Sequence, residues 1–363
     1  MLSFTAIGDG GLEHIKNLTS LRSLWINDTE ITDDGLGYLA QLRQIEELHL
    51  MNTQLSEQGL THLKDLEKLK SLRLVGTPIG DNGLVHLRGL NALEYLELPY
   101  DTGITEEGLS NLEGLNSLKK LYFYSDSISN KGLTILAKLK SLDDLSIGGR
   151  YITDSGLAHL QELTLLESLH IQRTKMTDVS LQYLGKLKSL RNLQLPKANI
   201  SDEGLTHIAG LASLERLDLS RTRIGDAGMA NLTNLHHLRA LDLGDTHVGD
   251  SGLLNLRNLI SLQELHLSRT NVTDTGLSHL KNLRSLHTLY LTNCKITDEG
   301  LVHLKGLEKL RHLSLYGTRI SDKGLIHLIG LKSLEVLTIT GTQVTQIGVE
   351  DLKKALPGCY VEQ

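Results

Sequence analysis

The repeat from Leu211 to Asn234, LASLERLDLSRTRIGDAGMANLTN, decides the fold of this protein. Its pattern, L-x-x-L-x-x-L-x-L-x-x-T-x-I-[TS]-D-x-G-L-x-x-L, recurs every 24 residues, with one repeat of 25, and occurs fourteen times in 363 residues. A fixed period of this length is typical of a solenoid, in which each repeat contacts only its neighbours. The repeats open at Leu18, Leu42, Leu66, Leu90, Leu115, Leu139, Leu163, Leu187, Leu211, Leu235, Leu259, Leu283, Leu307 and Leu331.

The repeats also set the domain organisation. Residues 1–17 are predicted to form an incomplete N-terminal half repeat, residues 18–354 the solenoid, and residues 355–363 a C-terminal end segment. Length alone would suggest two globular domains. A solenoid of about 14 repeats grows by stacking, so one elongated domain accommodates the whole chain.

Each repeat is expected to contain one short strand and one short helix. Around Leu217 and Leu219 polar and apolar residues alternate, which is the pattern of a strand with one buried face. Thr, Ser or Gly then provides a favoured helix N-cap, and an acidic residue follows in twelve of fourteen repeats, where it offsets the helix dipole. Because strands stack about 4.8 Å apart and helices about 8–10 Å, the sequence predicts an α/β horseshoe with a parallel sheet on its concave face and short helices on its convex face.

Two further positions have predicted structural roles. A Thr after the strand, such as Thr222, is expected to bond the backbone of the turn beside it. Gly stands two residues after the acid in thirteen of fourteen repeats, with Ser180 as the exception. Since Gly inside a helix costs about 1 kcal/mol relative to Ala, its persistence predicts that the backbone of the neighbouring repeat leaves no room for a side chain.

These residues resemble the leucine-rich repeat proteins. The most similar subtype is the cysteine-containing, GALA-like one of F-box proteins and large bacterial proteins, and Cys294 stands at the Thr position where that subtype has Cys. The ending from Leu352 to Cys359 is similar to endings of planctomycete-like bacterial repeat proteins. The resemblance implies a leucine-rich repeat solenoid. The chain departs from the F-box proteins, because no room for an F-box is expected before Leu18.

Composition and charge argue against several classes of partner. A net charge of −6 disfavours nucleic acid, because proteins that bind it usually carry a basic excess. No stretch approaches the roughly 18 apolar residues of a membrane span, and the first residues do not look like a signal peptide. Cys294 and Cys359 provide no disulfide framework. We therefore expect a cytoplasmic protein with no membrane partner.

The sequence contains no recognisable catalytic or metal motif. Eight of the sixteen His share one helix position, but one His per repeat does not converge into the three or four ligands that zinc requires. The P-loop, G-x-G-x-x-G, G-x-S-x-G, H-E-x-x-H and calcium-loop patterns are absent. We expect no enzyme activity, no cofactor and no bound metal.

Function is expected where the repeats differ from one another. Tyr and Arg are enriched at binding hot spots, and they gather with apolar residues on the predicted concave face of repeats 2 to 5. An extra residue near Tyr100 and the loss of Thr at Asp126 and Arg150 fall close by. The alternative is that the Tyr side chains merely cover one another. The predicted partner-binding residues are His49, Met51, Arg73, Val75, Tyr95, Glu97, Tyr100, Lys120, Tyr122 and Tyr124.

A second predicted surface carries mixed charge. Charged bands are often only solvated, which is the alternative interpretation here. A smaller group in repeats 12 and 13 comprises His287, Tyr290, His312 and Tyr316. The residues of the second surface are His170, Arg173, Lys197, Asp218, Arg221, Asp242 and Arg269.

The predicted function is that of a non-enzymatic scaffold that binds a protein partner on its concave face. Two alternatives remain open: a substrate-recognition arm of a larger protein, such as a ligase receptor, a kinase or a bacterial effector, and a binder of carbohydrate or of a cell-surface ligand. An exposed edge of the first strand, near Leu24, also predicts weak self-association, because a bare strand edge pairs readily.

Overall fold

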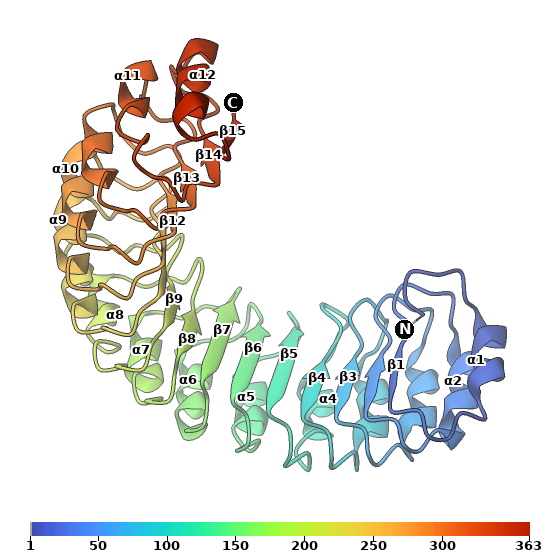
Figure 1. Ribbon diagram of the computed structural model, residues 1–363. Coiled ribbons are helices and arrows are strands. Elements are labelled where there is room, and N and C mark those ends of the chain that lie inside the picture. The colour runs from blue at the N-terminus through green and yellow to red at the C-terminus, as the bar shows by residue number, and fades with distance from the viewer. Residues whose placement is uncertain (1) are drawn as a thin grey trace. The chain divides into compact units, whose positions relative to one another are not determined.

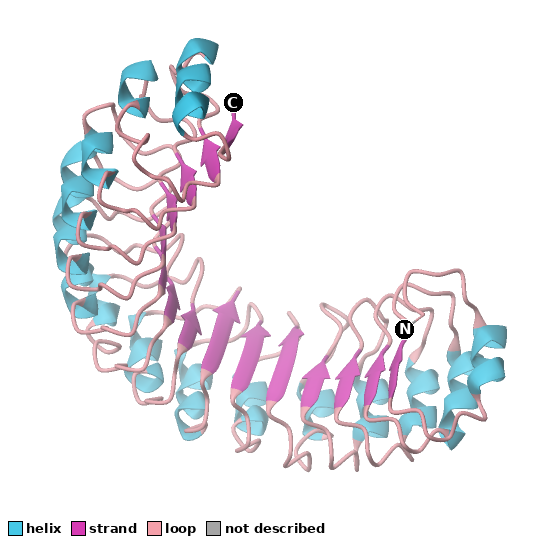
Figure 2. Cartoon of the chain, in the orientation of Figure 1, coloured by secondary structure: helices cyan, strands magenta, loops and turns pink. Residues whose placement is uncertain are grey.

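The computed structural model of the protein describes residues 2–363, so residue 1 of the predicted half repeat lies outside the described part. The chain divides into two compact units, Met1–Lys175 and Met176–Gln363. In each unit the strands are parallel and follow chain order. Within each unit the strands lie on one side and the helices on the other (Figures 1 and 2). We call these two sides the strand face and the helix face.

The first unit contains strands β1 to β7. Paired residues are 24 positions apart, as in Leu24 opposite Leu48, except that Tyr95 pairs with Lys120. The extra residue of repeat 4 is accommodated in the loop after β4, where Asp101 and Gly103 have positive φ. The strands are β1 (Ser23–Trp25), β2 (Glu47–His49), β3 (Ser71–Arg73), β4 (Tyr95–Glu97), β5 (Lys120–Tyr124), β6 (Asp144–Gly148) and β7 (Ser168–Gln172).

The second unit contains strands β8 to β15. The predicted C-terminal end segment contributes the last of them, because Tyr360 pairs with Val336 of the preceding strand. The strands are β8 (Asn192–Gln194), β9 (Arg216–Asp218), β10 (Ala240–Asp242), β11 (Glu264–His266), β12 (Thr288–Tyr290), β13 (His312–Ser314), β14 (Val336–Thr338) and β15 (Tyr360–Glu362).

The helices are short, and several repeats have a 3₁₀ turn in their place or after them. The α-helices are α1 (Asp9–Ile15), α2 (Asp33–Gly37), α3 (Asp81–Leu84), α4 (Glu106–Ser110), α5 (Asn130–Leu136), α6 (Asp154–Leu157), α7 (Asp178–Leu184), α8 (Asp202–Leu205), α9 (Asp250–Leu253), α10 (Asp274–Leu277), α11 (Asp322–Leu325) and α12 (Gln346–Ala355). The 3₁₀ helices are Tyr38–Gln41, Glu57–Leu63, Val85–Leu87, Ala158–Glu162, Gly228–Leu232, Leu254–Leu256, Ser278–Leu280 and Gly300–Leu304.

The core lies between the strands and the helices. The two inward-facing apolar residues of each repeat's strand region, usually Leu as in Leu48 and Leu50, are buried, together with the Leu that open the repeats from Leu42 onward. Removing one such side chain is expected to cost about 2–5 kcal/mol. The predicted role of the Thr position is confirmed where Thr is present: the Thr222 hydroxyl donates a hydrogen bond of 2.6 Å to the carbonyl of Leu219. Cys294 is buried at the same position and donates to the carbonyl of Leu267 at 3.0 Å.

The acidic residue after the cap has a role that the helix dipole alone does not explain. Its carboxylate accepts hydrogen bonds from the cap residue of the next repeat, so it connects consecutive repeats. Asp274, for example, accepts from the backbone N–H of Thr297 at 2.8 Å and from its hydroxyl at 2.6 Å. The same arrangement joins Asp250 to Thr273 and Asp298 to Ser321.

This connection changes the explanation of the Gly position. A Cβ atom added at Gly300 would lie 2.2 Å from Oδ1 of Asp274, whereas the Cα atom of Asp274 would be 3.2 Å away. The first obstacle is therefore the carboxylate of the preceding repeat. The predicted close approach of the neighbouring backbone is also present, because the Cα atom of Asp274 is nearer than an ordinary Cβ contact, but the prediction did not include the carboxylate in front of it.

The N-terminal strand edge also differs from the expectation. The backbone N–H groups of Leu2 and Phe4 donate to the carbonyls of Trp25 and Asn27, at 2.8 and 2.9 Å. The edge of β1 near Leu24 is therefore covered by the chain itself, and the prediction of a bare edge there was wrong. Self-association through that edge loses its physical basis.

Strands β5, β6 and β7 each have five residues, whereas the other strands have three. In most repeats one residue of the loop after the strand has positive φ, as Asn52 and Lys197 do, but the equivalent residues Ser125 and Gly149 do not. The backbone therefore remains extended for longer in repeats 5 and 6. As a result Ser125 is buried at this point, and its hydroxyl donates to the carbonyl of Ile104 at 2.7 Å.

Candidate functional site

Four tyrosine rings form the centre of the first predicted surface. The centroids of the Tyr95 and Tyr122 rings are 5.3 Å apart, and those of Tyr100 and Tyr124 are 5.2 Å apart. Three of these rings are half-buried, and Tyr100 is 42% exposed. We call Tyr95, Tyr100, Tyr122 and Tyr124 the tyrosine patch. The structure brings these four predicted residues together on the strand face.

Glu97 holds two of the tyrosine hydroxyls. Tyr95 and Tyr100 each donate a hydrogen bond of 3.2 Å to its carboxylate. The Arg73 guanidinium lies 4.9 Å from the Tyr95 ring centroid, and its Nε is 3.6 Å from the Glu97 carboxylate. Burial, assisted by the negative charge of Glu97, raises the pKa of both Tyr95 and Tyr100 to about 12. Both phenols are therefore uncharged hydrogen-bond donors at neutral pH.

The other two hydroxyls are held by β6 and β7. Tyr122 donates to the Asp144 carboxylate at 2.5 Å, and burial together with this bond raises the Tyr122 pKa well above its usual value. The Tyr124 hydroxyl contacts Ser146, and His170 Nδ1 is 3.2 Å from the oxygen of each. Each ring of the patch is thus fixed at both ends. Because Ser146 is only 6% exposed, its hydroxyl is kept from solvent rather than presented to a substrate.

Gly148 makes room for this arrangement. A Cβ atom at this position would lie 2.8 Å from Cδ1 of Tyr124 and 2.5 Å from the carbonyl oxygen of Gln172. Real Cβ atoms do not approach other atoms this closely, so the Tyr124 ring lies where only Gly leaves space. The loss of the repeat pattern in repeat 6 is therefore coupled to the position of a patch tyrosine.

An ion-paired rim follows the ends of the same strands. Arg173 donates to Asp101 at 3.0 Å and to Asp126 at 3.2 Å, and Arg150 pairs with Asp126. The bond from Arg150 holds the pKa of the Asp126 carboxyl below its usual value. These four side chains line a cavity of about 350 Å³. Arg150, which replaces Thr in its repeat, is exposed and does not occupy the buried Thr position.

Trp25 is a strand-face residue that the sequence prediction missed. Its ring stacks on His49, with centroids 4.9 Å apart and planes 9° apart. Burial and the nearby Arg73 lower the pKa of His49, which disfavours its charged form. Among residues 2–363, the Trp25 indole Nε1 and the Arg73 Nε are the buried side-chain nitrogens without a hydrogen-bond partner. Trp25 occupies the same strand position as His49, and this register was the available signal.

The remaining residues of the first prediction lie near the patch without joining its hydrogen-bond network. Met51 and Val75 are half-buried just after β2 and β3. Pro99, at the corresponding position after β4, is buried. Lys120 is exposed at the start of β5, in register with Tyr95.

The second predicted surface divides between the two units. His170 and Arg173 contact Tyr124, Asp101 and Asp126 and therefore belong with the patch and its rim. The other five predicted residues lie in the second unit. There, Arg221 and Arg269 each lie near Asp245, with closest distances of 3.5 and 3.6 Å. Lys197, Arg221 and Arg269 have positive φ, so they stand in the loops after the strands and not on the strands.

Asp218 and Asp242 lie side by side on β9 and β10. Burial raises the pKa of Asp242 above its usual value, and the charge of Asp218 adds to this effect. His266 opposes it, with its Nδ1 3.5 Å from the Asp242 carboxylate. The His266 ring also packs on Tyr290, with centroids 4.3 Å apart. This second group is more polar than the tyrosine patch and contains one tyrosine ring.

Metal sites and membrane-spanning helices are two further features to consider. Within residues 2–363, no group of three or more His, Cys, Asp or Glu side chains is placed to hold a metal ion. None of the helices in the described part of the chain is long and apolar enough to cross a membrane.

The family follows from the match of the repeats. A family model described as a leucine-rich repeat region matches residues 12–224. The chain belongs to the leucine-rich repeat family. A second model, described as a leucine rich repeat, matches three further segments of this leucine-rich repeat protein, residues 234–256, 258–281 and 282–304. A search of curated proteins finds no match.

Solved structures share the fold at low identity. An internalin (inlF) from Listeria monocytogenes is 23% identical, with a TM-score of 0.57, over 89% of this chain and 82% of that chain. A leucine-rich repeat protein of Leptospira interrogans is 21% identical, with a TM-score of 0.62, over 100% and 93%. A TDR receptor is 16% identical, with a TM-score of 0.59, over 99% and 67%. These identities establish a common fold and nothing more specific.

Proposed function

We propose that this leucine-rich repeat protein is a non-enzymatic scaffold that binds a protein partner on the strand face of its first unit, through the tyrosine patch. The observation that carries the proposal is the set of four adjacent tyrosine rings whose hydroxyls are already bound. Tyrosine supplies a large contact area with few rotatable bonds, and it is enriched at binding hot spots.

Preorganisation supports the proposal energetically. Ordering a flexible side chain at an interface costs about 0.5–1.5 kcal/mol. The patch tyrosines are already held by Glu97, Asp144 and the Ser146–His170 pair. Binding a partner therefore requires little further ordering of these side chains. The rim of Asp101, Asp126, Arg150 and Arg173 adds polar groups around the rings, as is usual for an interface.

The carbohydrate alternative has less support. Carboxylates beside aromatic rings often bind sugar hydroxyls, but here Glu97 and Asp144 already accept bonds from tyrosine hydroxyls. A glycan would have to displace those bonds. The alternative of a recognition arm within a larger protein uses the same surface, so the patch experiment applies to both.

The proposal is tested by capturing the partner from native lysate and measuring its affinity for a triple variant, Tyr95→Ala, Tyr122→Ala and Tyr124→Ala. We expect affinity to fall at least about 100-fold, because hot-spot truncations cost about 2 kcal/mol or more each. The matched control is the triple variant Tyr151→Ala, Tyr316→Ala and Tyr360→Ala, which removes three exposed tyrosines outside the patch. Circular dichroism establishes that both variants are folded. A folded patch variant that binds with unchanged affinity would refute the proposal.

The subtype and the location remain proposals. The cysteine-containing, GALA-like subtype is supported by Cys294, which occupies the Thr position and bonds the backbone from there. The bacterial origin and the cytoplasmic location rest on the sequence patterns alone.

A further inference from the structure

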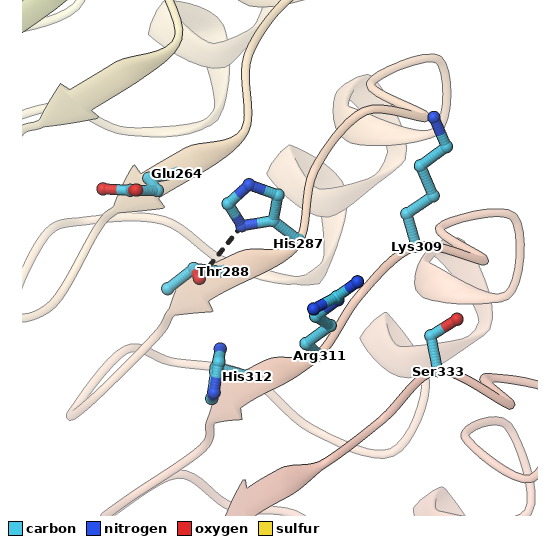
Figure 3. Close-up of a pocket in the computed structure, with 7 residues that line it drawn as sticks. All are labelled: Glu264, His287, Thr288, Lys309, Arg311, His312 and Ser333. Carbon is cyan, nitrogen blue, oxygen red and sulfur yellow. Dashed lines mark hydrogen bonds between the residues drawn. The ribbon is translucent and has the colours of Figure 1, made fainter.

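A cavity of about 510 Å³ lies in the second unit, beside the starts of β12 and β13. Its lining includes His287, Thr288, Lys309, Arg311, His312 and Ser333, and Glu264 lies at one end (Figure 3). No residue of the tyrosine patch and no residue of the mixed-charge surface lines it. Its volume is within the range of about 300–1,000 Å³ that is usual for ligand pockets.

The charge of this cavity is predominantly positive. The two carboxylates nearby each have an arginine partner: Arg216 is 3.5 Å from Glu264, and Arg311 is 3.6 Å from Glu335. In the part of the chain that the structure describes, no carboxylate lies within ion-pair distance of Lys309. Figure 3 shows the Glu264 carboxylate pointing away from the His287 ring.

The repeat pattern explains where the positive charge comes from. Arg311 occupies a repeat position whose earlier residues in the second unit alternate in charge: Arg191, Glu215 and Arg239. There Glu215 pairs with both arginines, at 2.5 and 3.7 Å. After Arg239 the same position holds Gln263, His287 and Arg311 before the next acid. The acidic residue that would neutralise this stretch is absent from two successive repeats.

The donors around the cavity determine the ligand that fits. Guanidinium and ammonium groups are donors only, and hydroxyls and imidazoles donate as well. All of these groups occur here on neighbouring repeats, and Arg311, which is 3.6 Å from Glu335, has further N–H groups to donate. His287 Nδ1 is 3.4 Å from the Thr288 hydroxyl oxygen, so ring and hydroxyl face each other. A planar carboxylate presents two oxygens, whereas a tetrahedral oxyanion presents three or four in different directions. We propose that this cavity binds a tetrahedral oxyanion, a phosphate or sulfate group, with Lys309 and Arg311 as its main ligands.

The test uses the full chain, with inorganic phosphate and inorganic sulfate as probes at constant ionic strength, measured by titration calorimetry. We expect saturable binding to the wild type, weakened at least about tenfold in the variant Lys309→Ala, Arg311→Ala, because the variant removes both charge-assisted hydrogen-bond donors. Both side chains are exposed, so the variant should fold.

The matched control is Arg239→Ala, Lys305→Ala, which removes one arginine from the same repeat position and one other exposed lysine of the second unit. It should bind the probes like the wild type. Equal affinities for the two double variants would overturn the proposal, and so would the absence of saturable binding of both anions.

A second arm separates a free ion from a group carried by another chain. Tighter binding of a short phosphoserine peptide than of inorganic phosphate would indicate a phosphorylated segment, whereas equal or tighter binding of inorganic phosphate would indicate the free ion. Either result supports the oxyanion site. If the same peptide with Glu in place of phosphoserine binds equally well, the tetrahedral geometry is irrelevant and the proposal is wrong.

Discussion

At the residue scale, each patch tyrosine is defined by the group that holds its hydroxyl. Tyr95 and Tyr100 share the Glu97 carboxylate, which is close enough to disfavour a second negative charge. Burial acts in the same direction, since ionisation in a less polar environment costs free energy. The same contacts that fix the rings therefore also keep them protonated.

Alkaline titration tests this coupling. Tyrosine normally ionises with a pKa near 10, whereas Tyr95 and Tyr100 should ionise near pH 12, visible as a late rise in absorbance at about 295 nm. Because the folded state retains these protons longer than the unfolded state, their contribution to stability is present below about pH 10. It is lost as the pH rises from about 10 to about 12. The part of the late rise near pH 12 that belongs to two tyrosines should disappear in the variant Tyr95→Phe, Tyr100→Phe, whereas the later ionisation of Tyr122 should remain until the protein unfolds. A rise near pH 12 of unchanged amplitude in the double variant would contradict the assignment.

At the element scale, consecutive repeats are joined by the carboxylate of one and the cap of the next. Asp298 accepts from the Ser321 backbone N–H at 2.7 Å and from its hydroxyl at 2.6 Å. The variant Asp298→Ala should lower the free energy of unfolding by about 1–3 kcal/mol, because it leaves a partly buried N–H without a partner. Urea denaturation measures the change.

Two controls isolate this bond. Asp351→Ala removes an exposed acid that pairs only with Lys354 three residues on, so it should change stability by no more than about 0.5 kcal/mol. Asp298→Asn should retain most of the stability, because the Asn130 Oδ1 accepts from the Thr153 N–H and the Asn130 Nδ2 donates to the Thr153 hydroxyl, both at 2.8 Å. A loss in Asp298→Asn as large as in Asp298→Ala would show that charge, and not the bond, is what matters.

The sequence predicted the elements well because each depends on residues close to it in the chain. Alternation around Leu217 and Leu219 indicates a strand, and the Thr222 hydroxyl bonds a carbonyl only three residues away. The link from Asp274 to Thr297 escaped prediction because it joins residues 23 positions apart, and the helix dipole already gave the acid a sufficient reason. The part that this carboxylate plays at Gly300 escaped prediction for the same reason.

The candidate site was predictable as a location but not as an arrangement. The departures from the repeat at Tyr122, Tyr124 and Arg150 marked the place. How these side chains are arranged depends on the longer strands β5 to β7, and no local sequence pattern predicts the extra strand length. His170 and Arg173 were assigned to a different surface because their partners are 46 to 72 residues away.

At the scale of the whole molecule, many exposed basic side chains have an acidic side chain of a neighbouring repeat as an ion-pair partner. Glu46 lies between Arg22 and Lys70 in the first unit, as Glu215 lies between Arg191 and Arg239 in the second. Such exposed pairs add little stability, but they prevent a continuous basic face. A net charge of −6 argues against non-specific binding to nucleic acid, which depends on a basic excess.

We therefore expect no binding of duplex DNA or single-stranded RNA in a fluorescence anisotropy titration up to about 10 µM protein at physiological salt, a range in which non-specific binders usually respond. If nucleic acid binds anywhere, the basic cavity is the first place to look, because Lys309 and Arg311 would contact a backbone phosphate. Two such contacts give a slope of only about −2 in the logarithm of affinity against the logarithm of salt concentration. Weak binding at low salt that disappears in Lys309→Ala, Arg311→Ala would fit a single anion pocket. A steeper slope that survives this variant would mean that the protein has a nucleic-acid surface, and the argument from paired charges would be wrong.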